Sequence, residues 1–251
     1  MDVAGKVVVV TGGGRGIGRA LAGRFHPEGS RVLVLDVAFG DEPALTSDYD
    51  SMPCDVSDAE SVRHAVGDVV DRFGAVDVLV NNAGVLGEGL VSDLDPARWQ
   101  RAFDVNVTGT FLMSQAVIPT MKSQNSGRII NAASFAAIVP SVGSAAYAAS
   151  KAAVVALTRV LASELGPWDV TVNAYAPGMI PTAMNGFADL PEAAQARLLD
   201  TLSLRRWGRP EEVADLVCFL ASDAAQYITG ALLDVSGGKL STQMPHRAYE
   251  L

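Results

Sequence analysis

The chain has 251 residues, of which 49% are hydrophobic and only 6% aromatic, so an interior built from Ala, Val, Leu and Ile is expected. Its formal net charge of −9 disfavours nucleic acid and anionic membrane surfaces as partners. Cys54 and Cys218 belong to no CxxC or Cys/His cluster, so neither a metal site nor a disulfide framework is predicted, and reduced thiols suit a cytoplasmic protein.

Neither targeting nor membrane insertion is predicted. The first residues, "MDVAGKVVVVTGGG", lack the basic start and long apolar run of a signal peptide. The stretch from Ile129 to Ser150 carries no charge, but Asn131, Pro140 and Gly143 interrupt it, which argues against a membrane span.

Strand-like and helix-like segments alternate along the chain. The run "KVVVVTG" predicts a buried strand, a helix is expected over about 16–26, and "RVLVLDV" predicts a second strand over 31–37. The later predicted elements are a helix over 57–74, a strand over 76–84, a long helix over 95–122, a strand over 127–134, a helix containing Tyr147, a strand over 169–178, helices near 190–203 and 210–221, and a strand over 231–238. This order predicts an α/β fold with one doubly wound parallel sheet of Rossmann type, helices on both faces, and a single domain over 1–251.

The segment "TGGGRGIG" over 11–18 joins the first strand to the first helix. Glycines at 12, 16 and 18 permit a tight turn, and the N–H groups that open the helix can receive a pyrophosphate. A strand-to-helix turn also needs glycine for steric reasons alone, so the motif favours a dinucleotide site mainly through its position.

Asp36 ends the second strand, about twenty residues after the glycine turn. A carboxylate there can accept hydrogen bonds from the ribose hydroxyls of NAD and repel the 2′-phosphate of NADP. Arg15 is a competing signal, since a guanidinium beside the glycines could hold that phosphate, whereas Val37 adds no positive charge. NAD is therefore the predicted cofactor and NADP the less favoured one.

Four polar residues form a candidate catalytic set. Tyr147 and Lys151 lie one turn apart on one helix face, Ser134 ends the strand before that helix, and Asn106 lies among apolar residues of the long helix. Each could instead be a buried polar group that satisfies its own hydrogen bonds. Their occurrence together beside a nucleotide-binding turn favours acid–base chemistry.

From Gly5 to about Gly238 the chain resembles the classical short-chain dehydrogenase/reductase family, in particular its NAD-type branch. The resemblance is carried by "TGGGRGIG", Asp55 in "CDV", "NNAG" (81–84), Asn106, Ser134, "YAASK" (147–151), "PGMIPT" (177–182) and "GRPEEVA" (208–214). The family often has Ser and Gly where this chain has Ala133 and Ala137, and the short interval from Asp36 to Asp55 puts a full helix between those strands in doubt.

The resemblance implies a set of cofactor contacts. Asp55 and Val56 would face the adenine, residues 81–84 would line the adenosine ribose, and Ile180 and Thr182 would hold the nicotinamide carboxamide. The full set of expected cofactor-binding residues is Gly12, Arg15, Gly16, Ile17, Gly18, Asp36, Asp55, Val56, Asn82, Ala83, Gly84, Tyr147, Lys151, Pro177, Gly178, Ile180 and Thr182.

Tyr147 is the expected proton acceptor in alcohol oxidation, with Ser134 bound to the same substrate oxygen. Bringing a phenol from its usual pKa near 10 to about 7 takes roughly 4 kcal/mol. The ammonium of Lys151 at ~5 Å is expected to supply about 3 kcal/mol of that. By the resemblance, Lys151 would also bind the nicotinamide ribose, and Asn106 would hold a water that links Lys151 to solvent.

The leading hypothesis is an NAD-dependent alcohol dehydrogenase or ketone reductase. An NADPH-dependent 3-oxoacyl thioester reductase is the alternative, because such enzymes share these motifs, and a binding protein that has lost catalysis is a third hypothesis. The segments over 85–90, 135–144 and 179–190 are expected to line the substrate pocket, with about 179–205 covering it. The three lining segments, 85–90, 135–144 and 179–190, contain no Lys or Arg, so a small neutral secondary alcohol or ketone, such as a polyol or sugar, is predicted.

The helix after Lys151 predicts self-association. Its sequence "AAVVALTRVLASEL" is apolar on almost every face, whereas a helix that covers one side of a sheet normally keeps a polar outer stripe. A homotetramer is therefore predicted, and the tail "KLSTQMPHRAYEL" could reach a neighbouring subunit.

Overall fold

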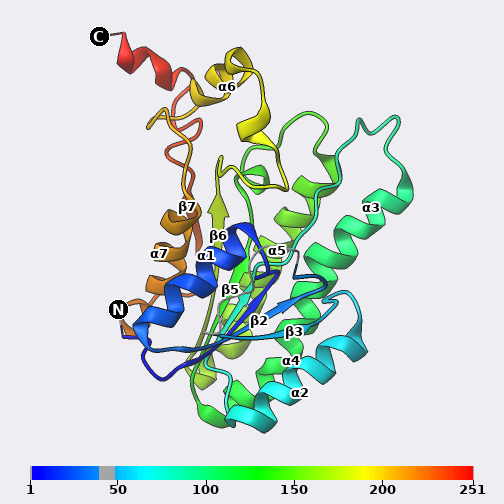
Figure 1. Ribbon diagram of the computed structural model, residues 1–251, viewed down its shortest axis with the longest axis vertical. Helices are drawn as coiled ribbons and strands as arrows, with labels where there is room; N and C mark the ends of the chain where they lie inside the picture. Colours follow the sequence, from blue (N-terminus) through cyan, green and yellow to red (C-terminus); the bar gives the residue numbers. More distant parts are fainter. Residues whose placement is uncertain (1, 40–48, 251) are drawn as a thin grey trace.

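A seven-stranded parallel sheet forms the centre of the molecule (Figure 1). The computed structural model describes residues 2–39 and 49–250, and the sheet has the strand order β3-β2-β1-β4-β5-β6-β7. The strands are β1 Val7–Thr11, β2 Arg31–Asp36, β3 Asp50–Pro53, β4 Val78–Asn81, β5 Gly127–Ala132, β6 Val170–Pro177 and β7 Leu232–Val235. The predicted α/β fold with a doubly wound parallel sheet is confirmed.

Helices cover both faces of the sheet because successive strand residues point to opposite sides. On β1, Val7 and Val9 pack in the core beneath α2, α4 and α5, whereas Val8 and Val10 pack beneath α1 and α7. The helices are α1 Gly16–Phe25, α2 Ala59–Phe73, α3 Pro96–Phe103, α4 Gly109–Gln124, α5 Ala145–Leu165, α6 Glu192–Leu199 and α7 Pro210–Ala221. In Figure 1, α1 and α7 lie together on one side of the sheet, and α2 and α4 lie on the other.

Two elements differ from the sequence prediction. Strand β3 was not predicted, because "DSMP" contains no β-branched or aromatic residue, yet it pairs in parallel with the end of β2. The helix predicted over 95–122 is divided into α3 and α4 by a π-helical turn at Asp104–Thr108. Such turns occur often at functional sites, and this one carries Asn106.

Helix α5 packs one face against the sheet and leaves the other exposed. With its short extension it spans Ala145–Trp168 and is long and apolar enough to cross a membrane by length and composition, but half of its most apolar window is buried inside the molecule. Its inner residues Leu161 and Leu165 pack against the sheet. One face of α5 therefore packs on the sheet, and this packing fixes Tyr147 and Lys151 near the carboxyl end of β5.

Helix α1 starts in close contact with the glycine turn. A Cβ atom on Gly18 would overlap the carbonyl oxygen of Gly12 and lie 2.6 Å from Nδ2 of Asn82. Gly23, one and a half turns further along α1, has open space around the same position.

We therefore expect Gly18→Ala to destabilise the fold by about 1–3 kcal/mol through overpacking. The matched variant Gly23→Ala should stabilise it by about 0.5–1 kcal/mol, because alanine loses less backbone entropy in a helix. Chemical denaturation of both variants measures these free energies of unfolding. A Gly18→Ala protein as stable as the wild type would contradict the close approach.

Candidate cofactor-binding and catalytic site

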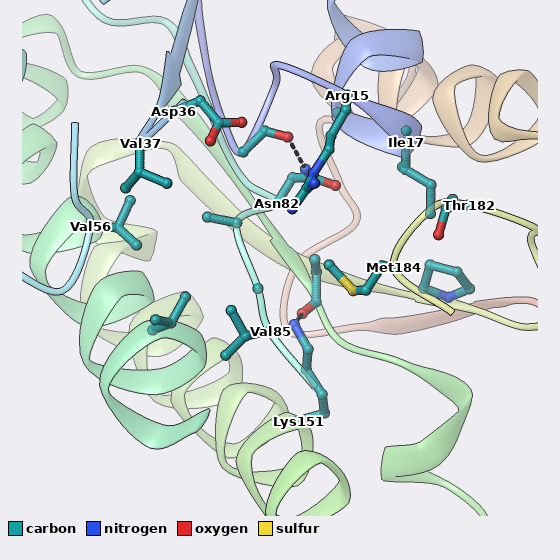
Figure 2. A pocket seen from close by; sticks show the side chains of 18 of the residues that line it. Arg15, Ile17, Asp36, Val37, Val56, Asn82, Val85, Lys151, Thr182 and Met184 are labelled. Atoms are coloured by element: carbon teal, nitrogen blue, oxygen red, sulfur yellow. Dashed lines mark hydrogen bonds between the residues drawn. The ribbon is translucent and has the colours of Figure 1, made fainter. Parts of the chain in front are cut away.

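A cleft opens at the carboxyl ends of β1, β2, β4 and β6, between the glycine turn and the segment after β6 (Figure 2). Open α/β sheets bind ligands at this edge. Most of the predicted cofactor-binding residues line the cleft: Gly12, Arg15, Gly16, Ile17, Gly18, Asp36, Asp55, Val56, Asn82, Ala83, Gly84, Tyr147, Lys151, Pro177 and Thr182.

The glycine turn fits a dinucleotide. Gly12 and Gly16 adopt positive φ angles of 62° and 55°, which are strained for other residues. A Cβ atom on Gly12 would lie 2.7 Å from Cα of Ala83, so the turn packs against the loop after β4 too closely for a side chain at this position. Arg15, just before α1, is exposed and makes no side-chain cap, so the N-terminus of α1 faces the cleft and can accept a pyrophosphate.

Asn82 joins this turn to the loop after β4. Its Nδ2 donates to the carbonyl oxygens of Thr11 at 3.1 Å and Gly12 at 3.0 Å, while the Thr11 hydroxyl accepts from the backbone N–H groups of Asn82 and Ala83. The hydroxyl of Tyr175 on β6 donates to Oδ1 of Asn82 at 3.0 Å. One amide therefore fixes the ends of three strands relative to each other.

Asn81, which the resemblance grouped with residues 82–84, points away from the cleft. Its Nδ2 donates to Asn131 and Ser114 in the buried layer between β4, β5 and α4. The expected ribose contact from Asn81 is therefore wrong for its side chain, and the contact with the cleft begins at Asn82.

Asp36 stands beside the glycine turn. Its Oδ2 accepts from the N–H of Gly14 at 2.9 Å, and Oδ1 accepts from Ala38 at 3.4 Å, so the carboxylate is held toward the cleft. Figure 2 places Asp36 and Val37 on one side of the opening and Arg15 across it. Asp36, which favours NAD, and Arg15, which could favour NADP, therefore border the same part of the cleft.

Asp55 and Val56 lie at the outer end of the cleft, next to an arginine that the sequence did not indicate. Oδ1 of Asp55 accepts from the N–H and hydroxyl of Ser57, and these bonds hold the pKa of the carboxyl below its usual value. Nη2 of Arg101 lies 4.0 Å from Oδ2 of Asp55. Arg101 also lines the cleft, so it offers a cation near the predicted adenine position.

Tyr147, Ser134 and Lys151 converge at the inner end. Ser134 hydrogen-bonds the Tyr147 phenol, and Nζ of Lys151 lies 5.7 Å from the centre of the Tyr147 ring. Lys151 is 4% exposed and donates to the carbonyl oxygen of Ala132 at 2.7 Å. The helix spacing thus brings phenol and ammonium to the same end of the cleft.

The expected lowering of the Tyr147 pKa by the Lys151 ammonium is opposed by the burial of both groups. Burial raises the pKa of Tyr147, and the bond from Ser134 opposes that rise only in part. Burial also lowers the pKa of Lys151 to about 8, so part of its positive charge is lost as the pH rises through that value. The chain alone therefore does not bring the phenol to a pKa near 7 through Lys151, because both groups share a poorly solvated position.

The side chain of Asn106 connects three segments around the catalytic residues. Its side chain is fully buried and forms three hydrogen bonds: Nδ2 donates to Val85 O and to Ser150 Oγ, and Oδ1 accepts from Val85 N. These bonds join the π-helical turn, the loop after β4 and α5. A Cβ atom on Gly84 would lie 3.2 Å from Asn106 Oδ1 and 3.4 Å from Lys151 Nζ, so the two side chains meet at Gly84.

The segment after β6 contributes fewer contacts than expected. Pro177 and Thr182 line the cleft, but Gly178 and Ile180 do not. Gly178 packs against Ser236, and Ile180 is buried in the core with its carbonyl oxygen accepting from Nδ2 of Asn185. Ile180 borders a second cavity with Gly208 instead.

Ten further residues line the cleft beyond the expected cofactor contacts, and three of them, Val85, Ala183 and Met184, belong to the segments expected to line the substrate pocket. The ten are Val37, Cys54, Val85, Arg101, Val105, Ala132, Ala133, Tyr175, Ala183 and Met184. Tyr175 is the most informative of these, because its burial on β6 raises its pKa and its hydroxyl positions Asn82. In the sequence, Tyr175 stands between two alanines on a buried strand, a pattern that indicates core packing and does not indicate a role at the cleft.

A parallel sheet with a glycine turn, an acidic β2 end and a Ser/Tyr/Lys cluster defines a dinucleotide-dependent oxidoreductase. The comparisons agree. A family model described as enoyl-(acyl carrier protein) reductase matches residues 12–239. The chain belongs to the short-chain dehydrogenase/reductase family, as the sequence resemblance implied.

Individual relatives cover almost the whole chain. A 3-oxoacyl-(acyl-carrier-protein) reductase of Thermotoga maritima is 37% identical over 245 residues, 95% of this chain and 99% of that protein. The trans-4-hydroxycyclohexanecarboxylate dehydrogenase of Sinomonas cyclohexanicum is 37% identical over 250 residues, 94% of this chain and 93% of that protein. The crystal structure of levodione reductase matches with a TM-score of 0.87 at 33% identity, covering 94% of this chain and 97% of that one.

Proposed function

We propose that the protein interconverts a secondary alcohol and the corresponding ketone with NAD as cofactor. The observation that carries the proposal is the convergence of Ser134, Tyr147 and Lys151 at the inner end of a cleft built for a dinucleotide. The names of the relatives support it, since they include a dehydrogenase of a ring-borne alcohol and reductases of ketone groups.

When bound, the dinucleotide would supply hydride acceptance or donation. The Tyr147 oxygen would take the hydroxyl proton of the alcohol, and Ser134 would hydrogen-bond the same substrate oxygen to fix its position. The protonated form of Lys151 would place a positive charge near the phenolate, and burial lowers the pKa of this lysine to about 8. Asn106 would keep α5 and the loop after β4 at the distance this proton transfer needs.

Replacement of the phenol tests this mechanism. Tyr147→Phe should lower turnover by at least ~10² while leaving NAD binding nearly intact, because general acid–base groups contribute about that much. Tyr227→Phe is the matched control, since Tyr227 is fully exposed and lies outside the cleft. Steady-state oxidation of a panel of secondary alcohols and a separate NAD titration give the two quantities. A Tyr147→Phe enzyme with most of its activity would exclude the proposed role.

NAD is the proposed cofactor because Asp36 faces the cleft with its carboxylate already held by Gly14. A 2′-phosphate there would meet a negative charge, and Arg15 is the competing cation. The relatives named as 3-oxoacyl-(acyl-carrier-protein) reductases give NADPH-dependent thioester reduction as the second candidate function. The net charge of −9 disfavours an acidic carrier protein as partner.

Asp36→Asn keeps the shape of the side chain and removes its charge. We expect the preference for NAD over NADP, as a ratio of kcat/KM, to fall at least ~10-fold, which corresponds to about 1.4 kcal/mol. Asp68→Asn on the outer side of α2 should leave the ratio unchanged. A wild-type enzyme that already prefers NADP and reduces acetoacetyl thioesters would overturn the NAD assignment in favour of the second candidate.

A homotetramer is proposed from the outer face of α5. Ala152, Ala156 and Val160 are exposed there, and Val160 is 54% exposed. Phe111 on α4 is likewise 43% exposed. Small and apolar residues on the outer side of two helices let a second helix pair approach closely.

A cytoplasmic location and the absence of nucleic-acid and membrane partners stay predictions from composition.

Light scattering at micromolar concentration should give about four times the 26.2 kDa chain mass. Val160→Glu should dissociate the assembly, since a carboxylate would be buried without a partner. His64→Glu, on the exposed face of α2, is the matched control and should leave the mass unchanged. A wild-type mass of one chain would refute the assembly.

A further inference from the structure

Lys239 lies outside every segment expected to form the substrate pocket, but the fold returns it to the catalytic region. Gly237 and Gly238 follow β7 with φ angles of 69° and 74° and turn the chain. The N–H of Lys239 then donates to Ser236 Oγ at 3.1 Å, and the N–H of Leu240 donates to the Thr201 carbonyl at 2.8 Å. The backbone at Lys239 is therefore fixed against the segment after α6.

The ammonium of Lys239 reaches the residue that follows the catalytic serine. Its Nζ lies 5.2 Å from the centre of the Phe135 ring, and Phe135 is directly bonded to Ser134 in the chain. The carboxyl end of β5 thus has Lys151 on the side of α5 and Lys239 on the side of the C-terminal segment.

Within the described residues, Lys239 has no carboxylate partner and its side chain has no hydrogen-bond acceptor. The neighbouring cations differ: Arg205 pairs with Asp200 and Arg206 pairs with Glu212. Lys239 is also partly buried, and this burial lowers its pKa. A partly desolvated ammonium that rests only on an aromatic ring gains most from an anion that binds beside it.

We propose that Lys239 binds a carboxylate carried by the substrate, so that the enzyme acts on a small hydroxy acid or keto acid. This inference rests on the proposed alcohol–ketone chemistry and replaces the neutral substrate expected from the sequence. The three pocket segments do lack Lys and Arg, but the cation comes from residue 239. A phosphate on a carrier-protein thioester is a poorer match, because the whole pantetheine arm separates that phosphate from the reacting carbonyl, whereas Lys239 stands beside Phe135.

The test compares two ligands of one shape. The enzyme saturated with NAD is titrated calorimetrically with cyclohexanecarboxylate and with cyclohexanecarboxamide. Wild type should bind the carboxylate at least ~10-fold more tightly than the amide, because charge-assisted hydrogen bonds are stronger than neutral ones. Lys239→Met should reduce this ratio to near one, and Lys239→Arg should keep most of it.

Lys122→Met is the matched control, because Lys122 Nζ also lies over an aromatic ring, 3.8 Å from the centre of Trp168. Trp168 precedes β6, whereas Phe135 follows the parallel strand β5, so the two lysines lie at opposite edges of the sheet. Lys122→Met should keep both the wild-type ratio and the wild-type oxidation of cyclohexanol. Equal affinities for the two ligands in the wild type, no binding of the carboxylate, or an unchanged ratio in Lys239→Met would overturn the assignment. A wild type that oxidises no secondary alcohol or hydroxy acid would instead count against the proposed function.

Discussion

The site depends on the side-chain amide of Asn82. This one side chain, from the loop after β4, bonds to the glycine turn after β1 and to the phenol of Tyr175 on β6. Its partners Thr11 and Tyr175 are buried, so losing either bond would leave a buried donor or acceptor unpaired at a cost of about 1–3 kcal/mol. The glycines at 12 and 18 follow from this arrangement, since the amide and the neighbouring loop occupy the space that their Cβ atoms would need.

At the catalytic end, burial acts on two ionisable side chains, Lys151 and Tyr147. Lys151 is buried and bonded to the Ala132 carbonyl, and burial favours the neutral forms of both Lys151 and Tyr147. The free chain therefore holds the phenol protonated, ready to donate to a ketone oxygen. For alcohol oxidation the phenolate must be stabilised by charge that arrives with the bound ligands, because the protein alone raises the pKa of Tyr147.

The features that could be predicted from the sequence are those that depend on local backbone geometry. The strand-to-helix turn needs glycine, the end of β2 carries an acid, and a helix places Tyr147 and Lys151 four residues apart, so these residues could be named and all line the cleft. Prediction failed where tertiary contacts decide. Strand β3 has a polar sequence and pairs with β2. The side chain of Asn106 in the π-helical turn bonds to Val85 and Ser150, which are distant in the sequence.

The substrate end shows why specificity is the hardest property to obtain from sequence. The proposed carboxylate site joins segments more than a hundred residues apart, since Phe135 follows β5 and Lys239 follows β7. The segments over 85–90, 135–144 and 179–190 contain no Lys or Arg, and this absence predicts a neutral substrate. In the folded chain, hydrogen bonds between the segment after α6 and residues 237–240 fix the position of Lys239. The same segment pairs its own arginines with Asp200 and Glu212, whereas Lys239 has no carboxylate partner within the described residues.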